Sequence, residues 1–305
     1  MARQTLLTDS ADISVRDERR PPGFLRRLAR GRAALISLAF IIAIMLAALV
    51  GPAIYGVDPT HTDFTSINAP PSLAHLLGTD RLGHDTLARL LAALRVSLLV
   101  AVVVETINIL VGAPLGLLAG YFGGWIDVLI SRLADMFFAF PGLLLAILVA
   151  AVFGQAVTEQ YGSTARLVLV AGSLSLVGWP LMARYVRGQV LSLRERDFVL
   201  AAQAIGQSER GILQRHILPN VAGLVITAAT LDVVNAIVGE ATLSLLGLGI
   251  QAPATSIGKM IVEATPFLAQ NPFLVFVPST TLTLLVLAFS FLGDGMRRAF
   301  DPTGR

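Results

Sequence analysis

The sequence predicts an all-α polytopic membrane protein with about six transmembrane helices. Of its 305 residues, 55% are hydrophobic and only 14% are charged, which is more apolar than a soluble domain of this length needs to be. The apolar residues gather in runs of about 20, the length with which a helix crosses a bilayer. Most of the 23 Lys and Arg residues lie between or beside these runs.

The chain begins with a polar segment and one apolar run. Residues 1–32 carry eight arginines and predict a cytoplasmic N-terminal tail. The run Ala33–Val50 is expected to be an uncleaved first transmembrane helix, because a long tail precedes it. A polar loop rich in Pro, Gly and Asp follows over residues 51–94, so residues 33–95 hold the first helix and its external loop.

Five further apolar runs predict the core of the protein over residues 96–293. They are Val96–Ala119, Leu133–Phe153, Leu167–Val186, Val221–Leu248 and Phe273–Leu292. The run Val221–Leu248 exceeds the usual crossing length and contains Asp232, Asn235 and Glu240, so we expect a bend or a short re-entrant turn in it. With a C-terminal tail at 294–305, the excess of cations in alternate segments predicts that both termini are cytoplasmic.

Several classes of function are excluded. Without cysteine the chain has no disulfide and no thiolate site. Its only lysine, Lys259, precedes Met260 and not Ser or Thr, so there is no phosphate-binding P-loop and ATP-driven work would need another subunit. The four histidines lack the spacing of a metalloprotease and no serine nucleophile motif occurs. We therefore expect no enzyme activity, no cofactor and no nucleic-acid partner.

Acidic residues within or at the edges of the runs have a high free-energy cost in hydrocarbon, so each is expected to serve a structural or functional role. They are Glu105, Asp127, Asp135, Asp232 and Glu240. For Asp127 and Asp135 we favour hydrogen bonds between helices or contact with the interface. For Asp232 and Glu240, with Asn235 beside them, a pathway or gating role and a structural role both stay open.

Glycines recur every four residues at Gly112, Gly116 and Gly120. Small residues at this spacing let two helices approach closely. We therefore expect close helix packing here, with Pro114 as a source of a kink.

The polar island Arg184–Pro219 holds six arginines and is expected in the cytoplasm. Asp197 is predicted to cap a short helix, and Gly206 to end it. Ser208 is expected to cap a second turn and Pro219 to open the next span. Each short helix has an apolar face, which implies a partner or the membrane surface, and of the two we favour a docking partner. The faces consist of Phe198, Ala201, Ala202 and Ile205, then Ile212, Leu213 and Ile217.

The island also contains a recognisable motif. Asp197–Asn220, DFVLAAQAIGQSERGILQRHILPN, resembles the "EAA" loop of binding-protein-dependent ABC importer permeases. In that family this loop, here about 187–219, forms the coupling helix that sits in a groove of the cytoplasmic ATPase. The resemblance assigns ATPase coupling to a set of residues in this sequence. They are Asp197, Phe198, Ala201, Ala202, Gly206 and Pro219.

Other stretches look like the dipeptide, oligopeptide and nickel branch of these permeases, and like its "C" subunit. They are His75–Asp85, Tyr121–Ile147, Val177–Val199, Leu243–Pro253 and Leu292–Pro302. Two positions depart from the pattern. Leu200 stands where the motif opens with glutamate, so a polar contact to the ATPase is either absent or supplied by a neighbour such as Glu195 or Asp197. His84 stands where arginine is expected.

The resemblance implies a MetI-like ABC permease fold in the inner (cytoplasmic) membrane of a prokaryote. It implies an ATP-driven importer of short peptides with a homologous second permease, two ABC ATPases and an extracytoplasmic substrate-binding protein as partners. Nickel chelates or glutathione-like peptides are alternative cargoes. A self-sufficient secondary transporter that uses the intramembrane acids, or a scaffold without transport, are alternatives of another class.

Overall fold

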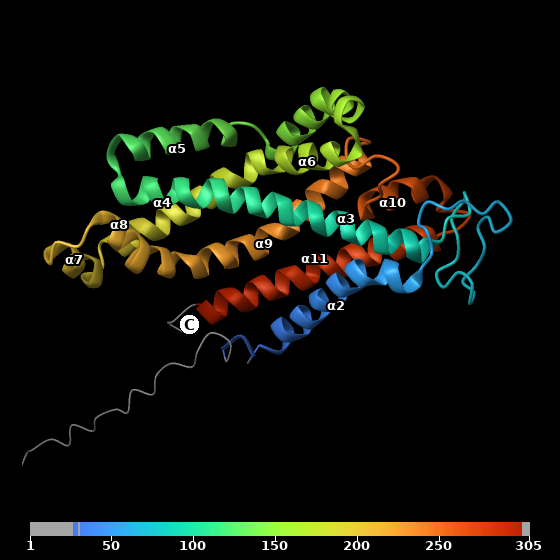
Figure 1. Ribbon diagram of the computed structural model, residues 1–305, viewed down its shortest axis with the longest axis horizontal. Helices are drawn as coiled ribbons and strands as arrows, with labels where there is room; N and C mark the ends of the chain where they lie inside the picture. The colour runs from blue at the N-terminus through green and yellow to red at the C-terminus, as the bar shows by residue number, and fades with distance from the viewer. Residues whose placement is uncertain (1–26, 30, 301–305) are drawn as a thin grey trace, which may run out of the picture.

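The computed structural model describes residues 27–29 and 31–300, and within them it is helical with no strand. Most of the predicted N-terminal tail and the last five residues of the chain lie outside the described residues. The helices form an elongated bundle (Figure 1). In chain order they are α2 (Arg32–Tyr55), α3 (Thr86–Ile107), α4 (Ala113–Phe122), α5 (Gly124–Phe138), α6 (Gly142–Arg194), α7 (Asp197–Ala204), α8 (Glu209–Ile212), α9 (Leu218–Leu245), α10 (Ile257–Ala264) and α11 (Phe273–Phe300).

Five segments among the described residues are long and apolar enough to cross a membrane. They are Arg32–Tyr55, Thr86–Phe122, Gly142–Arg194, Glu209–Leu245 and Phe273–Phe300. A π-helical turn, Asn108–Gly112, joins α3 to α4, just before Pro114. A second one, Leu213–Ile217, joins α8 to α9. The polytopic all-α prediction is therefore confirmed.

The segment α6 consists of two helices. Gly162 separates them with φ 80° and ψ −178°, a backbone conformation that glycine adopts without a steric penalty. The chain folds back at this kink (Figure 1). The predicted helix Leu133–Phe153 is wrong, because α5 ends at Phe138 and α6 begins after Pro141. Proline disfavours the helical conformation in the residue before it, which explains the break.

Two other boundaries differ from the predictions. Helix α9 runs without interruption through Asp232 and Glu240, so the expected re-entrant turn is absent. Helix α3 begins ten residues before the predicted Val96, because the Asp85 carboxylate accepts a hydrogen bond from Ala88 N at 2.8 Å and caps the helix. The external loop is correspondingly shorter and spans residues 56–85.

The two ends of the bundle differ. The pair α7–α8 lies at one end, which we call the tip end, and the start of α2 and the end of α11 face toward it (Figure 1). Residues 56–85 and α10 lie at the other, the loop end. This arrangement fits the charge distribution, which predicts that the polar island and the two tails share one side of the membrane.

The glycine stripe packs as predicted. Helix α4 and the π-helical turn before it lie against the second half of α6. A Cβ built on Gly112 would come within 2.5 Å of the Trp179 carbonyl oxygen, and one on Gly120 within 2.8 Å of Val190 Cβ. The Gly116 position faces the Ala183 carbonyl as closely. Only glycine permits this approach of the two backbones.

Candidate functional site

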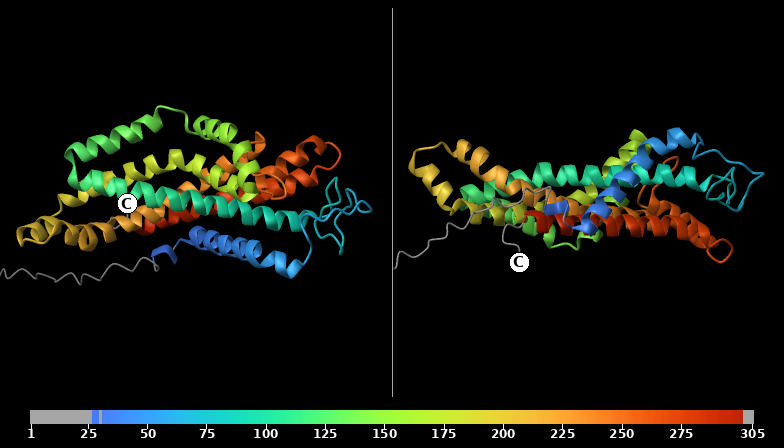
Figure 2. Two further views of the ribbon diagram at one scale, coloured as in Figure 1. Left: turned by 45° about the horizontal axis from the view of Figure 1, so that its top comes forward. Right: turned by 90° about the horizontal axis from the view of Figure 1, so that it is seen from below.

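The predicted coupling segment projects from the tip end of the bundle (Figure 2). Helix α7 begins at Asp197, but the residue before it, Arg196, occupies the N-cap position and no side chain caps the helix. The prediction that Asp197 caps it is therefore wrong. Asp197 lies in the first turn instead, where its negative charge interacts favourably with the helix dipole.

The turn and helix starts of this segment lie where the sequence predicts them. Gly206 has φ 77°, and no atom lies within 4 Å of a Cβ built on it, so glycine is required there by the backbone conformation and not by crowding. Ser208 caps α8, and its hydroxyl accepts from Gly211 N at 3.3 Å. Pro219 lies in the first turn of α9. These three predictions are confirmed.

The apolar residues of the tip divide between its interior and its surface. Ala202 is buried beside Ile212 and Ile217, in a cluster that α6 and α9 complete. The expectation of an exposed apolar face on the second short helix is wrong, since α6 and α9 cover it. Five apolar residues of the first helix and its end are exposed, and Ile205 is the most exposed at 83%. They are Phe198, Leu200, Ala201, Ala204 and Ile205.

Arginines of α6 hold the helices around the tip together. The Arg187 guanidinium donates to both oxygens of Asp127, at 2.5 and 2.7 Å. Arg184 contacts Asp135 at 3.2 Å. Two arginines of the polar island therefore tie α6 to α5, and the favoured interpretation of the two aspartates as contacts between helices is confirmed.

A polar group lies within the bundle where α3 meets α9. The Asn108 amide donates to Glu105 Oε1 at 3.4 Å and to Asp232 Oδ2 at 3.3 Å. Asn235 donates to Asp232 Oδ1 at 2.8 Å. The other carboxylate oxygen of Glu105 is buried without a hydrogen-bond partner in the described part of the chain.

This polar group borders a cavity of about 290 Å³. Asn108, Asp232 and Asn235 supply its polar lining, and apolar residues, most of them from α6, supply the rest. Gly178 of α6 packs directly against the Asn108 amide, so that a Cβ there would overlap it. The arrangement can present carboxylate and amide groups to a passing polar molecule.

Glu240 has a different environment. It is 1% exposed, and it accepts hydrogen bonds from Ser97 at 3.1 Å and Ser244 at 2.7 Å. Ser97 also accepts from Ile257 N, and Ser244 contacts Ser256. Glu240 thereby ties α9 to α3 and to the start of α10, and it does not line the cavity beside Asp232.

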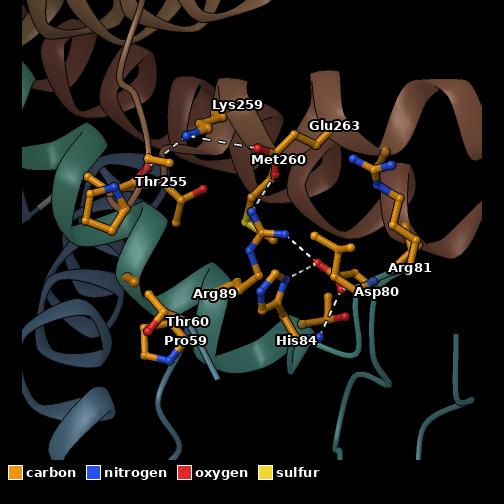
Figure 3. A pocket seen from close by; sticks show the side chains of 18 of the residues that line it. Pro59, Thr60, Asp80, Arg81, His84, Arg89, Thr255, Lys259, Met260 and Glu263 are labelled. Carbon is orange, nitrogen blue, oxygen red and sulfur yellow. Dashed lines mark hydrogen bonds and ion pairs between the residues drawn. The ribbon is translucent and has the colours of Figure 1, made fainter. Parts of the chain in front are cut away.

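A charged network at the loop end is not predicted from the sequence. Arg89 pairs with Asp80 and, at 2.5 Å, with Glu263 (Figure 3). His84 Nδ1 lies 2.9 Å from Asp80, so the histidine that departs from the family pattern shares its acid with Arg89. Burial raises the pKa of Asp80, but hydrogen bonds from His84 and from backbone N–H groups, and the Arg89 charge, lower it overall. The only signal was the dense charge around the motif His75–Asp85.

Comparisons with known families identify the fold. Residues 112–305 match the family described as "binding-protein-dependent transport system inner membrane component". The chain belongs to this family. Residues 23–71 match the N-terminal transmembrane domain of oligopeptide transport permease C. These matches confirm the resemblance that the motifs indicate.

Relatives match along nearly the whole sequence. The oligopeptide transport system permease protein OppC of Mycobacterium tuberculosis is 36% identical over 281 residues, 92% of this chain and 94% of the relative. The dipeptide permease DppC of Alkalihalophilus pseudofirmus is 37% identical, covering 91% and 88%. The glutathione permease GsiD of Pectobacterium atrosepticum is 36% identical, covering 95% and 93%.

A solved structure supports the fold. The inward-facing MetNI methionine ABC transporter superposes with a TM-score of 0.55 at 20% identity, covering 70% of this chain and 96% of that chain. The predicted MetI-like permease fold is confirmed, and the protein is a transport component with several membrane-spanning helices.

Proposed function

We propose that this chain is the transmembrane permease subunit of an ATP-driven importer that moves short peptides across the cytoplasmic membrane. The observation that carries the proposal is the identity of 36–37% with oligopeptide and dipeptide permeases over 91–92% of this chain. A glutathione permease is as similar, and glutathione is itself a short peptide. Glutathione-like peptides are therefore the second candidate cargo.

The proposed complex contains a homologous second permease, two ABC ATPases and an extracytoplasmic binding protein. Because the chain has no P-loop, the ATPases must supply the energy. The tip end and both termini lie on the cytoplasmic side, in keeping with the basic residues there. The exposed apolar residues of α7, with Asp197 and Glu195 beside them, supply the surface that an ATPase contacts.

Coupling follows from how the tip is attached. Helix α7 follows α6 after two residues, and the buried Ala202 anchors it against α6 and α9. When the ATPases close, a displacement of α7 shifts these helices and changes which side of the pathway is open. Asp232 and Asn235 lie beside a cavity in the bundle and are the residues we assign to the pathway.

The first experiment isolates the chain from its native membranes in mild detergent and identifies what accompanies it. A second permease and P-loop ATPases in stoichiometric amounts are the expected result. Vesicles with the whole complex and the binding protein should then take up peptides only when ATP is present. Gradient-driven transport by this chain alone would contradict the importer proposal and support a secondary transporter.

Substitution of Gly206 tests the coupling role of the tip. Gly206→Val places a β-branched residue at φ 77°, so the turn between α7 and α8 should distort and ATP-driven uptake should fall by at least about tenfold. The measurement is uptake together with ATP hydrolysis in vesicles. Gly188→Ala is the matched control, since Gly188 is helical with open space around it and should transport normally. Normal uptake by Gly206→Val would remove Gly206 from the coupling mechanism.

A further inference from the structure

The loop end contains a larger cavity than the one beside Asp232. Its volume is about 580 Å³, and it lies between the loop 56–85, the start of α3, the loop after α9, and α10 (Figure 3). This volume is within the range of about 300–1,000 Å³ that is usual for small-ligand sites. Apolar side chains, among them Val96, Met260 and Leu274, make up much of its lining.

Two buried hydroxyl groups line this cavity without a partner. Thr86 is 2% exposed and Thr255 is 7% exposed, and neither Oγ1 has a hydrogen-bond partner within residues 27–29 and 31–300. A buried hydroxyl without a partner is costly, at about 1–3 kcal/mol. A ligand with hydrogen-bonding groups on one side and an apolar part on the other would satisfy both features of the lining.

The charges of the lining favour an anionic group. Arg89 engages both acids, Asp80 and Glu263. Lys259 Nζ donates to the Ala254 carbonyl at 3.1 Å but lies 4.0 Å from the nearer Glu263 oxygen, so its ammonium group has only a distant counterion. Burial lowers the pKa of Lys259, and an adjacent anion would stabilise its charged form.

A second cation lies at the same site. The Arg81 guanidinium stacks over the Phe267 ring at 5.1 Å, and both residues line the cavity. This contact directs the guanidinium without neutralising it. In Figure 3, Lys259 and Arg81 lie on opposite sides of the ion pairs that Arg89 forms with Asp80 and Glu263.

We propose that this cavity is a ligand site of the permease itself, which receives the carboxylate end of a short peptide. The carboxylate pairs with Lys259 or Arg81, the peptide groups meet the Thr86 and Thr255 hydroxyls, and the last side chain contacts the apolar lining. The inference rests on the proposed function, under which the loop end faces the binding protein and a released peptide meets this cavity before it enters the membrane.

The test uses the permeases and ATPases assembled without the binding protein, in nanodiscs of phosphatidylcholine. Binding of the dipeptide Ala-Leu and of its C-terminal amide is compared by saturation-transfer NMR. We expect saturable binding of Ala-Leu and binding of the amide that is weaker by about tenfold, since the amide lacks the charge. Lys259→Met should weaken Ala-Leu binding by about tenfold, and Lys259→Arg should retain it.

Thr255→Val is the second variant, because it keeps the shape and removes only a hydroxyl without a partner. It should fold at least as stably as the parent and bind Ala-Leu about threefold more weakly. Equal binding of the acid and the amide, or no effect of either variant, would overturn the proposal. The proposal would also be overturned if the Lys259-dependent signal came from phosphatidylglycerol added to the nanodiscs and not from Ala-Leu.

The outcome separates the two proposals. ATP-driven peptide uptake by the complete transporter, without Lys259-dependent binding of Ala-Leu, would refute the ligand site alone. Absence of ATP-driven uptake of every peptide tested would refute the proposed function.

Discussion

Helix α9 carries two acids, the half-buried Asp232 and the buried Glu240, in contrasting surroundings. Each oxygen of Glu240 accepts a hydrogen bond from a serine, and these serines connect α9 to α3 and α10. Asp232 shares the single amide of Asn108 with a second acid, Glu105, and lies beside a cavity. One oxygen of Glu105 has no partner in the described structure.

The contrast distinguishes two reasons for placing an acid in a membrane. A carboxyl group whose hydrogen bonds are complete stabilises the contacts between helices. An acid whose partners are shared and incomplete contributes little stability and is available to a polar molecule in the adjacent space. The two sites should therefore respond in opposite ways to substitution.

The largest effect is expected at Glu240. Glu240→Ala leaves the Ser97 and Ser244 hydroxyls without an acceptor and opens a cavity, so the free energy of unfolding should fall by about 2–4 kcal/mol. The measurement is thermal unfolding of the purified protein in detergent. Glu240→Gln, which keeps the shape and an acceptor oxygen, should cost about 1 kcal/mol. If both variants are as stable as the parent, Glu240 has no structural role.

A smaller effect is expected at Gly178, which contacts the other acid group through Asn108. The Cβ of Gly178→Ala would lie 2.6 Å from Asn108 Cγ, so the amide that serves Glu105 and Asp232 must move. We expect a loss of about 1–3 kcal/mol in stability, together with reduced uptake. Gly172→Ala, in the same helix with open space around it, should be neutral or stabilising. Equal behaviour of the two variants would exclude a specific role for the Gly178 contact.

The smallest effect on stability, and one of opposite sign, is expected at Asp232. Asp232→Asn removes one of two acids that share an amide. Its one remaining carbonyl oxygen can accept from Asn235, and its new NH2 group can donate to Asn108 Oδ1, which has no hydrogen-bond partner in the described structure, once the Asn108 amide turns over. The protein should become more stable by about 0.5–1 kcal/mol, because the substitution removes a carboxylate whose charge is taken partly out of water. Uptake should fall several-fold if Asp232 lies in the pathway. A destabilised variant with normal uptake would place Asp232 in the same structural class as Glu240.

Much of the fold can be predicted because its signals are local. Long apolar runs predict the membrane-spanning segments, and Gly206, Ser208 and Pro219 predict the turns of the tip. The Phe140–Pro141 pair indicates the helix break at Pro141, but the hydrophobicity of the neighbouring residues favours one continuous helix and led to the wrong prediction. The re-entrant turn expected in α9 is absent, and its acids bond to residues of other helical segments, which no local pattern shows.

The sites are predicted less completely, for the same reason. Spacing alone cannot separate Asp232 from Glu240, since the serine and asparagine partners that distinguish them lie 143 and 124 residues away in the sequence. A helical period shows that a helix has an apolar face, but not whether other helices of the same chain cover that face. Ile212 and Ile217 are buried because α6 and α9 cover them. Motif resemblance identified the tip, while the start of α7, with Arg196 at the N-cap position and no capping side chain, depended on where α6 ends.

The glycine stripe has a mechanical consequence. Between α4 and α6 no layer of side chains separates the backbones at Gly112, Gly116 and Gly120. Sliding one helix along the other would bring the carbonyl oxygens of α6 into steric conflict with α4. The two helices therefore resist sliding and move together as one rigid unit. Helix α7 follows α6 after only two residues. A rotation imposed on the tip would therefore turn α6 and α4 together, and the rotation would be transmitted to the middle of the membrane without loss.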